Sequence, residues 1–206
     1  MRTLVIDSAS EACSVALFED RTLIAGECLV LGRGHAERLV PMIAALPDRG
    51  RAGRIAVSLG PGSFTGLRVG LAAAQALALA WQAEVLGFPT LALVAAAARQ
   101  DAGAQPIGVA MTGGHGEWFV AGFGADGAPS RPLASMRPDA AAADTTEALV
   151  AGSQAEALVA ARGSGRALPL LPDARRFALL DEAFLTATLA PIYGRAPDAR
   201  LPAAAQ

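Results

Sequence analysis

Hydrophobic and polar side chains alternate along the first thirty or so residues of the chain. Alternation with a period of two is typical of strands that bury one face. It predicts strands at about residues 3–8, 13–18 and 22–31. The dipeptide Asp20-Arg21 has the length of a tight connection between the last two of them. The opening segment is therefore predicted to form an antiparallel meander.

The spacing of the apolar residues then changes from two to three or four. Between Glu37 and Leu46 this spacing predicts a short helix, which Gly34 precedes and Pro47 ends. The segment 49–54 combines glycines with three arginines. We interpret it as a solvated turn rather than a phosphate site.

A strand, a glycine-rich turn and a long helix are predicted next, in that order. The short apolar run Ile55–Leu59 is typical of a fully buried strand, and it leads directly into GPGSFTG at residues 60–66. The apolar region from Val69 to Trp81 is interrupted by Gln75, which makes it too short and too polar for a membrane span. We predict a core helix there. A further strand and helix are predicted at 85–88 and 91–99.

The second half of the chain repeats the first in outline, after a polar segment at 100–105. Strands are predicted at 106–111, 117–123 and 130–136. Residues 157–160 are interpreted as a strand before a second glycine turn, with a helix at 174–187 and an extended strap or tail from Pro191 to Gln206. We therefore expect two lobes, residues 1–103 and 104–206, with a duplicated β-β-β-α-β-α order and a reduced second lobe.

Composition and charge narrow the function classes. The 206 residues are 53% hydrophobic, which is enough for a sizeable core. A net charge of -2 provides no field that draws the chain onto nucleic acid or a membrane, so any contact with RNA is expected to be indirect. Asp7 follows only three apolar residues, which argues against a signal peptide and for a cytoplasmic protein. Cys13 and Cys28 are interpreted as small buried side chains, directly opposite each other if the hairpin is regular.

The turn at residues 60–66 carries the most specific pattern in the chain. Glycines permit backbone conformations that other residues resist, and N–H groups at the start of a helix can hold a phosphate. The candidate phosphate-binding residues in this turn are Gly60, Gly62 and Ser63. The segment is not a P-loop, because no Gly-Lys-Ser/Thr follows. A tight strand-to-helix turn without a ligand is the alternative, and the pattern leaves both open.

Asp7 and Ser8 end the first predicted strand and are further candidates for binding a nucleotide phosphate or Mg²⁺. A duplicated fold that hydrolyses ATP needs a second carboxylate at the matching turn of the other half, because the metal and the attacking water both need anionic partners. Thr112 stands near that place instead. His35 and His115 form no zinc or iron motif, and His35 is interpreted as a surface or capping residue. We therefore predict no catalytic residue and no metal ligand.

Small residues follow one side of the helix after the glycine turn. The stripe consists of Gly66, Gly70, Ala73 and Ala74 at helical spacing, and it ends in the larger side chains of Leu77 and Trp81. This stripe is either plain core or a docking face for a partner.

Three segments together resemble the bacterial TsaB (YeaZ) family. They are IDSASEACSVAL at 6–17, HAERLVPM at 35–42 and GPGSFTGLRVG at 60–70. The run PIYGR at 191–195 is similar to the Pro-x-Tyr-x-Arg ending of that family. The likeness is close in the first half of the chain and thin between that half and the ending.

The resemblance implies an α/β fold of the actin-like, Hsp70-like (ASKHA) type and a non-catalytic scaffold role in forming threonylcarbamoyladenosine at tRNA adenosine 37 (t6A). A TsaD-like subunit would carry the chemistry and the metal, a TsaE-like ATPase would join, and the chain alone would form a homodimer. No cofactor is required of this chain, although ATP or ADP can bind at a subunit junction. The implied contact residues are His35, Arg38, Leu39, Met42, Thr65, Gly66, Arg68, Val69, Gly70, Ala73 and Leu77.

The second half departs from the family pattern. The family usually has an Asp-Ala-Arg-x-Gly-Glu turn, whereas this chain has TGGHGE at 112–117 and lacks that Asp and Arg. Two other functions stay open. One is an active ATPase or sugar kinase of the same fold, against which the missing second carboxylate argues, and the other is a peptidase, for which ligands are missing. We expect Gly70→Trp or Arg68→Glu to abolish partner binding and to leave the monomer folded.

Overall fold

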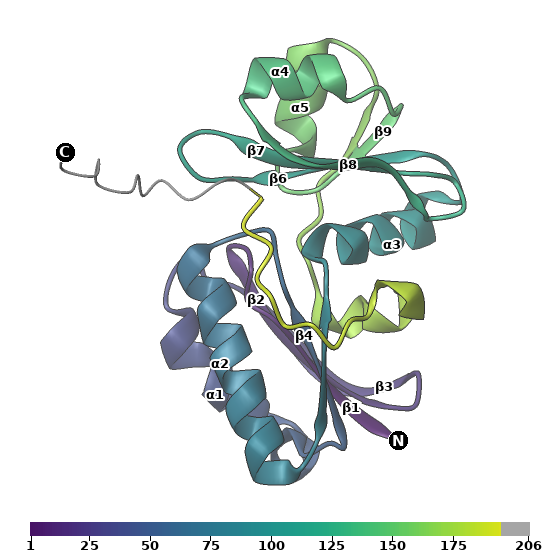
Figure 1. Cartoon of the computed structure of the whole chain (residues 1–206). Helices are drawn as coiled ribbons and strands as arrows, with labels where there is room; N and C mark the ends of the chain where they lie inside the picture. The colour runs from purple at the N-terminus through teal and green to yellow at the C-terminus, as the bar shows by residue number, and fades with distance from the viewer. Residues whose placement is uncertain (195–206) are drawn as a thin grey trace, which may run out of the picture.

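The first half of the chain forms a five-stranded mixed sheet, shown in the lower part of Figure 1. This computed structural model describes residues 1–194. The strands are β1 (Arg2–Asp7), β2 (Ala12–Glu19), β3 (Thr22–Val30), β4 (Arg54–Ser58) and β5 (Glu84–Phe88), in the order β3-β2-β1-β4-β5. The first three strands pair antiparallel, and β4 and β5 add to β1 in parallel. The predicted meander and the two later strands are confirmed.

The second half forms a sheet of the same topology. Its strands are β6 (Ile107–Thr112), β7 (Trp118–Phe123), β8 (Pro129–Met136), β9 (Leu149–Ala151) and β10 (Arg166–Leu168), in the order β10-β9-β6-β7-β8. Reversed, this order matches the first sheet strand for strand, with β6 in the place of β1. The duplication is confirmed, and β9 and β10 have only three residues each where β4 and β5 have five. The second lobe is reduced, as expected.

Helices cover the outer faces of both sheets and fill the space between them (Figure 1). They are α1 (His35–Ala45), α2 (Phe64–Trp81), α3 (Thr90–Ala102), α4 (Pro138–Asp144) and α5 (Ala155–Arg162), with 3₁₀ turns η1 (Pro47–Gly50), η2 (Ala174–Leu179) and η3 (Glu182–Phe184). By length and composition, α2 is the one helix among the described residues that could cross a membrane. It packs along β4 and β1 as a core helix, so this is weak evidence for a span.

Two predicted elements of the second half are wrong. Residues 157–160 lie inside α5, and the strand is β9 upstream of it. Three residues are too few to show a period, while the alanine-rich run has a high helix propensity. The helix predicted at 174–187 is split into η2 and η3, because Asp173 and Asp181 each accept a backbone N–H and start a separate turn.

Each lobe contributes a helical segment to the inner face of the other sheet. α3 follows β5 of the first lobe but packs on β6 and β7, and η2 follows the second lobe but packs on β1, β2 and β3. The N–H of Ala174 at the start of η2 donates to the Ser14 hydroxyl over 2.9 Å. One buried cluster therefore combines side chains of both lobes, including Val5, Phe18, Val109 and Phe119. The segment that carries η2 thus packs against the sheet of the first lobe.

The two cysteines are not opposite each other, contrary to the regular-hairpin expectation. Cys13 pairs with Leu29, and Cys28 pairs with Ser14, because the register shifts between Leu17 and Phe18. A shift of one residue moves side chains to the other face of a sheet. Only Cys13 is fully buried, and both thiols are free. Burial raises the pKa of each thiol to about 11.

The chain after η3 crosses back over the first lobe as a strap. Gly87 and Thr186 exchange two backbone hydrogen bonds, of 2.7 and 3.0 Å, and the N–H of Ile192 donates to the carbonyl of Leu59 over 2.7 Å. The ring of Tyr193 lies 5.6 Å from that of Phe64 at the start of α2. The expected strap is confirmed up to residue 194. Arg195 and the rest of the predicted tail lie outside the described residues.

Candidate functional site

Asp7 is completely buried at the carboxyl end of β1. Its Oδ1 accepts the N–H of Ala9 over 3.0 Å, while Oδ2 has no hydrogen-bond partner. Burial raises the pKa of this carboxyl to about 7, and the negative charge of Asp173 on the returning chain adds to the rise. Asp7 is therefore a sealed carboxyl group that solvent and nucleotide do not reach in this structure.

The glycine turn closes directly over the end of β1. The N–H of Ser63 donates to the carbonyl of Ala9 over 2.6 Å, and the Ser8 hydroxyl donates to the carbonyl of Gly66 over 2.8 Å. A Cβ on Gly62 would lie only 1.9 Å from the carbonyl oxygen of Ala9. The glycines are thus needed because two backbone segments touch, which is the ligand-free alternative left open above.

The structure brings all five predicted phosphate-binding residues together, namely Asp7, Ser8, Gly60, Gly62 and Ser63. Two of their backbone donors are used within the lobe: the N–H of Gly60 donates to the Ser58 hydroxyl, and that of Ser63 donates to the carbonyl of Ala9. The Ser63 hydroxyl caps α2 by accepting the N–H of Gly66 over 3.2 Å. A phosphate held by the N–H groups of Gly60 and Ser63 would have to break these bonds.

The matching strand end in the second lobe carries no acid. Thr112 ends β6 as Asp7 ends β1, and its hydroxyl accepts a hydrogen bond of 2.8 Å from the side-chain amide of Gln154. Its backbone N–H donates to the Ser153 hydroxyl over 3.0 Å. Among residues 1–194, no group of three or more His, Cys, Asp or Glu side chains is placed to hold a metal ion.

His35 was predicted to be a surface or capping residue, and this is wrong. The side chain is buried at the start of α1, and its Nε2 lies 2.9 Å from the carbonyl of Ser10 and 3.3 Å from that of Ala12. A protonated ring nitrogen donates there. His35 therefore ties α1 to the turn between β1 and β2.

Five of the predicted partner-contact residues are turned into the lobe instead. His35, Leu39, Met42, Gly66 and Gly70 are buried. A Cβ on Gly70 would lie 2.5 Å from the Ser8 hydroxyl, so the expectation that Gly70→Trp leaves the monomer folded is wrong. The stripe of small residues is thus core at Gly66, Gly70 and Ala74, because these positions lie against β1 and β4.

The rest of the predicted contact set stays accessible on α1 and α2. Arg38, Thr65 and Arg68 are exposed, and Val69, Ala73 and Leu77 are half-buried. The guanidinium of Arg68 lies 3.7 Å above the ring of Phe64.

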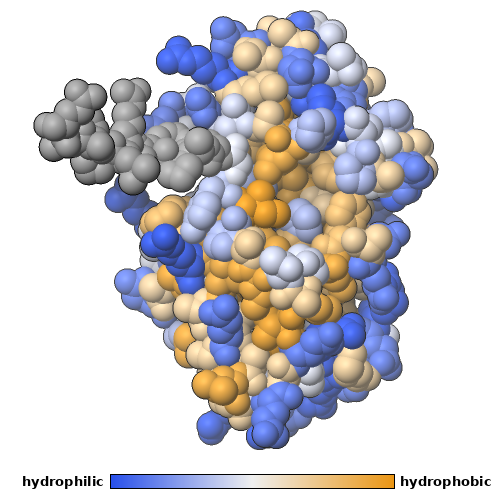
Figure 2. Space-filling model, viewed as in Figure 1, coloured by the Kyte–Doolittle hydropathy of each residue, from blue (hydrophilic) through white to orange (hydrophobic). Residues whose placement is uncertain are grey.

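Two large exposed side chains on these helices were missed. Leu79 is 85% exposed on α2, and Val40 is 60% exposed on α1. On α2, Leu79 follows the exposed Ala72 by seven residues, so the two lie on the same side of the helix, opposite the buried glycines. This spacing could have been read from the sequence. In the view of Figure 2, hydrophobic residues run from the junction of the lobes down the middle of the lower lobe.

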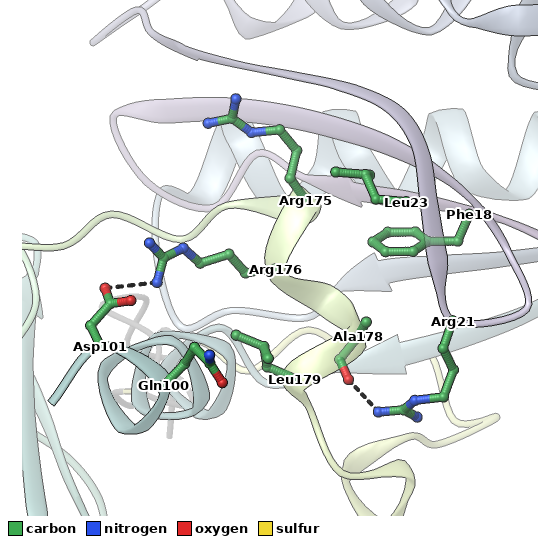
Figure 3. A pocket seen from close by; sticks show the side chains of 9 residues that line it. All are labelled: Phe18, Arg21, Leu23, Gln100, Asp101, Arg175, Arg176, Ala178 and Leu179. Atoms are coloured by element: carbon green, nitrogen blue, oxygen red, sulfur yellow. Dashed lines mark hydrogen bonds and ion pairs between the residues drawn. The ribbon is translucent and has the colours of Figure 1, made fainter. Parts of the chain in front are cut away.

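A separate pocket of about 310 Å³ lies where η2 meets α3 and the β2–β3 hairpin (Figure 3). Apolar and arginine side chains line it together: Phe18, Arg21, Leu23, Gln100, Asp101, Arg175, Arg176, Ala178 and Leu179. Arg176 pairs with Asp101 over 2.8 Å, and Arg21 bonds to the carbonyl of Ala178. None of the predicted site residues lines this pocket.

Comparisons with known proteins agree on one family. The family model described as TsaD, tRNA N6-adenosine threonylcarbamoyltransferase, matches residues 30–144, more than half of the chain. The tRNA threonylcarbamoyladenosine biosynthesis protein TsaB of Escherichia coli (strain K12) is 38% identical over 131 residues, which cover 61% of this chain and 56% of that protein. The solved structure of YeaZ from Pseudomonas aeruginosa matches with a TM-score of 0.76 at 28% identity, over 93% of this chain and 99% of the other. The chain belongs to the TsaB/YeaZ family.

This TsaB/YeaZ member has the expected α/β fold of the actin-like type, with two lobes of one topology. The tRNA N6-adenosine threonylcarbamoyltransferase of Anaeromyxobacter sp. (strain Fw109-5) is also similar, at 31% identity over 166 residues, which cover 68% of this chain and 49% of that enzyme. The TsaB/YeaZ chain spans about half the length of the curated relatives that it matches. Its likeness therefore extends to a named transferase as well as to TsaB.

Proposed function

We propose that this TsaB/YeaZ member is a non-catalytic scaffold subunit that acts with a TsaD-like and a TsaE-like partner in threonylcarbamoyl transfer to tRNA adenosine 37. The names of two relatives support the pathway, because one is a threonylcarbamoyladenosine biosynthesis protein and the other is the transferase. The net charge of -2 fits a cytoplasmic subunit that meets tRNA through its partners.

The main support for a non-catalytic role comes from the residues at the ends of β1 and β6. Phosphoryl transfer in a two-lobed fold needs accessible anionic oxygens to hold Mg²⁺ and to position the attacking group. Here Asp7 is sealed under the glycine turn, and Thr112 takes the matching place in the second lobe. The shared apolar core also fills the space between the sheets. These features favour a protein that binds partners through its surface over one that catalyses phosphoryl transfer.

The proposed docking face for the TsaD-like partner consists of the outer sides of α1 and α2. It combines Val40, Ala72 and Leu79 with the accessible part of the predicted set, and its charged side chains in that set are Arg38 and Arg68. An exposed apolar face with few charges fits a protein partner better than tRNA, whose phosphates attract basic patches.

Replacing one of two matched alanines by arginine tests this face. Ala72 on α2 and Ala160 on α5 are both exposed helix positions. Ala72→Arg is expected to weaken binding to the TsaD-like partner by about tenfold to a hundredfold, because a long charged side chain would be placed in the interface, whereas Ala160→Arg should bind as the unmodified chain does. The measurement is titration of the purified partner with each variant, with circular dichroism to verify folding. Equal affinity of the two variants would reject the α1–α2 face.

The competing function is an active ATPase or kinase of the same fold. It requires Asp7 to reach a nucleotide, which the closed turn opposes. The isolated chain is expected to show no ATP turnover above buffer. Turnover that Asp7→Ala abolishes while the chain remains folded would establish the ATPase instead, and peptide cleavage by the isolated chain would establish a peptidase.

A further inference from the structure

The pocket of Figure 3 lies between three segments that are distant from one another in the sequence. The turn η2 runs between α3 on one side and the β2–β3 hairpin on the other, and it packs against both. The space between them is about 310 Å³, at the lower end of the range of about 300 to 1,000 Å³ that is typical of small-molecule sites. The pocket therefore has room for a small ligand.

Apolar side chains from the hairpin and from η2 line one part of this pocket. Phe18 lies on β2, Leu23 on β3 and Leu179 at the end of η2. Leu23 is 43% exposed and Leu179 is 38% exposed, so two large apolar side chains from separate elements face water at the same place. A ligand that covers them removes apolar surface from water, which is favourable.

Arg176 of η2 provides free hydrogen-bond donors in the same pocket. Its Nη1 donates to the carboxylate of Asp101 over 2.8 Å and to the carbonyl of Ala97 over 3.4 Å. Within residues 1–194, no hydrogen bond uses Nε or Nη2 of this side chain. These two nitrogens form one edge of the flat guanidinium, and such an edge can hold both oxygens of a carboxylate.

The charges around the pocket favour a ligand with a single negative charge. Three arginines and one aspartate line the pocket, so positive charge is in excess there. Two further acids lie beside the lining. Asp173 pairs with Arg175 over 2.7 Å, and Glu182 pairs with Arg21 over 3.8 Å. Because these acids offset much of the excess, a doubly charged phosphate would add a surplus of negative charge that a carboxylate does not.

We propose that this pocket binds a small monocarboxylate with an aromatic or branched apolar body. The carboxylate accepts hydrogen bonds from Nε and Nη2 of Arg176, and the apolar body covers Leu23 and Leu179. The pocket is separate from the glycine turn and from the α1–α2 face, so the inference does not depend on the proposed function.

A ligand in this pocket contacts η2, α3 and the hairpin together. Because η2 and α3 are the segments that each lobe contributes to the other, the bound ligand stabilises the junction of the lobes. A ligand that binds only the folded chain lowers the unfolding equilibrium constant, by about elevenfold when its concentration is ten times Kd.

Titration of the full chain with phenylacetate, followed by the NMR shifts of the backbone amides, tests the proposal. We expect a Kd of about 1 mM, because so small a ligand makes few contacts. Phenylacetamide lacks the charge, acetate lacks the apolar body and phenyl phosphate carries the second charge, so each should bind more weakly by about fivefold or more. No binding of phenylacetate at about 20 mM, or binding of any of the other three as tight as that of phenylacetate, would overturn the proposal.

The position of the shifts and one matched pair of variants locate the ligand. The shifts should gather at 18–23, 100–101 and 175–179, and shifts centred on the glycine turn or on α2 instead would place the ligand elsewhere and reject this pocket. Arg176→Gln should weaken phenylacetate binding by about tenfold, because glutamine lacks the two-donor edge. Arg166→Gln is the control, since Arg166 is an exposed arginine of β10 that does not line the pocket. Circular dichroism verifies folding, and equal affinity of the two variants would contradict the assigned role of Arg176.

Discussion

Replacing Gly66 by alanine should destabilise the first lobe by more than about 3 kcal/mol, because the added methyl group would meet the backbone. An ideal Cβ on Gly66 lies 2.1 Å from the carbonyl oxygen of Ser8, far inside van der Waals contact. That oxygen belongs to the turn after β1 and cannot rotate away as a side chain could. The same helix turn also loses the hydrogen bond from the Ser8 hydroxyl to the Gly66 carbonyl if the segments separate.

The measurement is the free energy of unfolding from urea titration followed by circular dichroism. Gly53→Ala is the matched control, since a Cβ at Gly53 meets nothing within 4 Å and its backbone is outside the left-handed region. The control should change stability by well under about 1 kcal/mol. A Gly66→Ala variant as stable as Gly53→Ala would show that α2 does not press on the turn after β1 as described.

Asp7→Asn should stabilise the chain at neutral and alkaline pH, by up to about 4 kcal/mol, and much less in acid. Burial raises the pKa of Asp7 from 3.8 to about 7, so the folded state holds a proton that the unfolded state releases between these values. The contribution of Asp7 to the free energy of unfolding is therefore most favourable below about pH 4 and is lost as the pH rises to about 7. Asparagine is neutral throughout and keeps an oxygen for the N–H of Ala9.

The two chains should be compared by urea titration at several pH values between 4.5 and 8.5, chosen around the raised pKa of Asp7 near 7. The quantity that decides is the difference in unfolding free energy, which should grow with pH and level off above about 7. The same substitution at the exposed Asp126 controls for the loss of one negative charge. A difference that does not vary with pH would contradict a buried, proton-holding Asp7.

Local pattern was sufficient for the elements whose neighbours in sequence are also neighbours in space. The alternation before residue 31, the helix that Pro47 ends and the glycine turn before α2 are all seen in the structure. Their residues pair or pack with the next element along the chain, so period and turn chemistry carry the information. The family resemblance added the actin-like fold, which agrees with the relatives.

The sequence predicted which residues belong to the candidate site but not how they contact one another. The sequence named Asp7, Ser8 and the glycine turn as separate candidates for binding a phosphate, and the structure brings them together. It did not show that their donors bond to each other or that Asp7 is sealed. Likewise, helical spacing identified a stripe on α2 but not which side of the helix the sheet would cover, since small residues suit both a core and an interface.

The sequence by itself determined the order of strands and helices in the first half, the duplication in outline, the absence of a second acid at the matching strand end and the need for glycine before α2. Only the tertiary structure decided the shifted cysteine pairing, the burial of His35 and the exchange of α3 and η2 between lobes. The physical reason is that a pattern shows which side chains need burial, whereas contacts between distant segments determine what buries them.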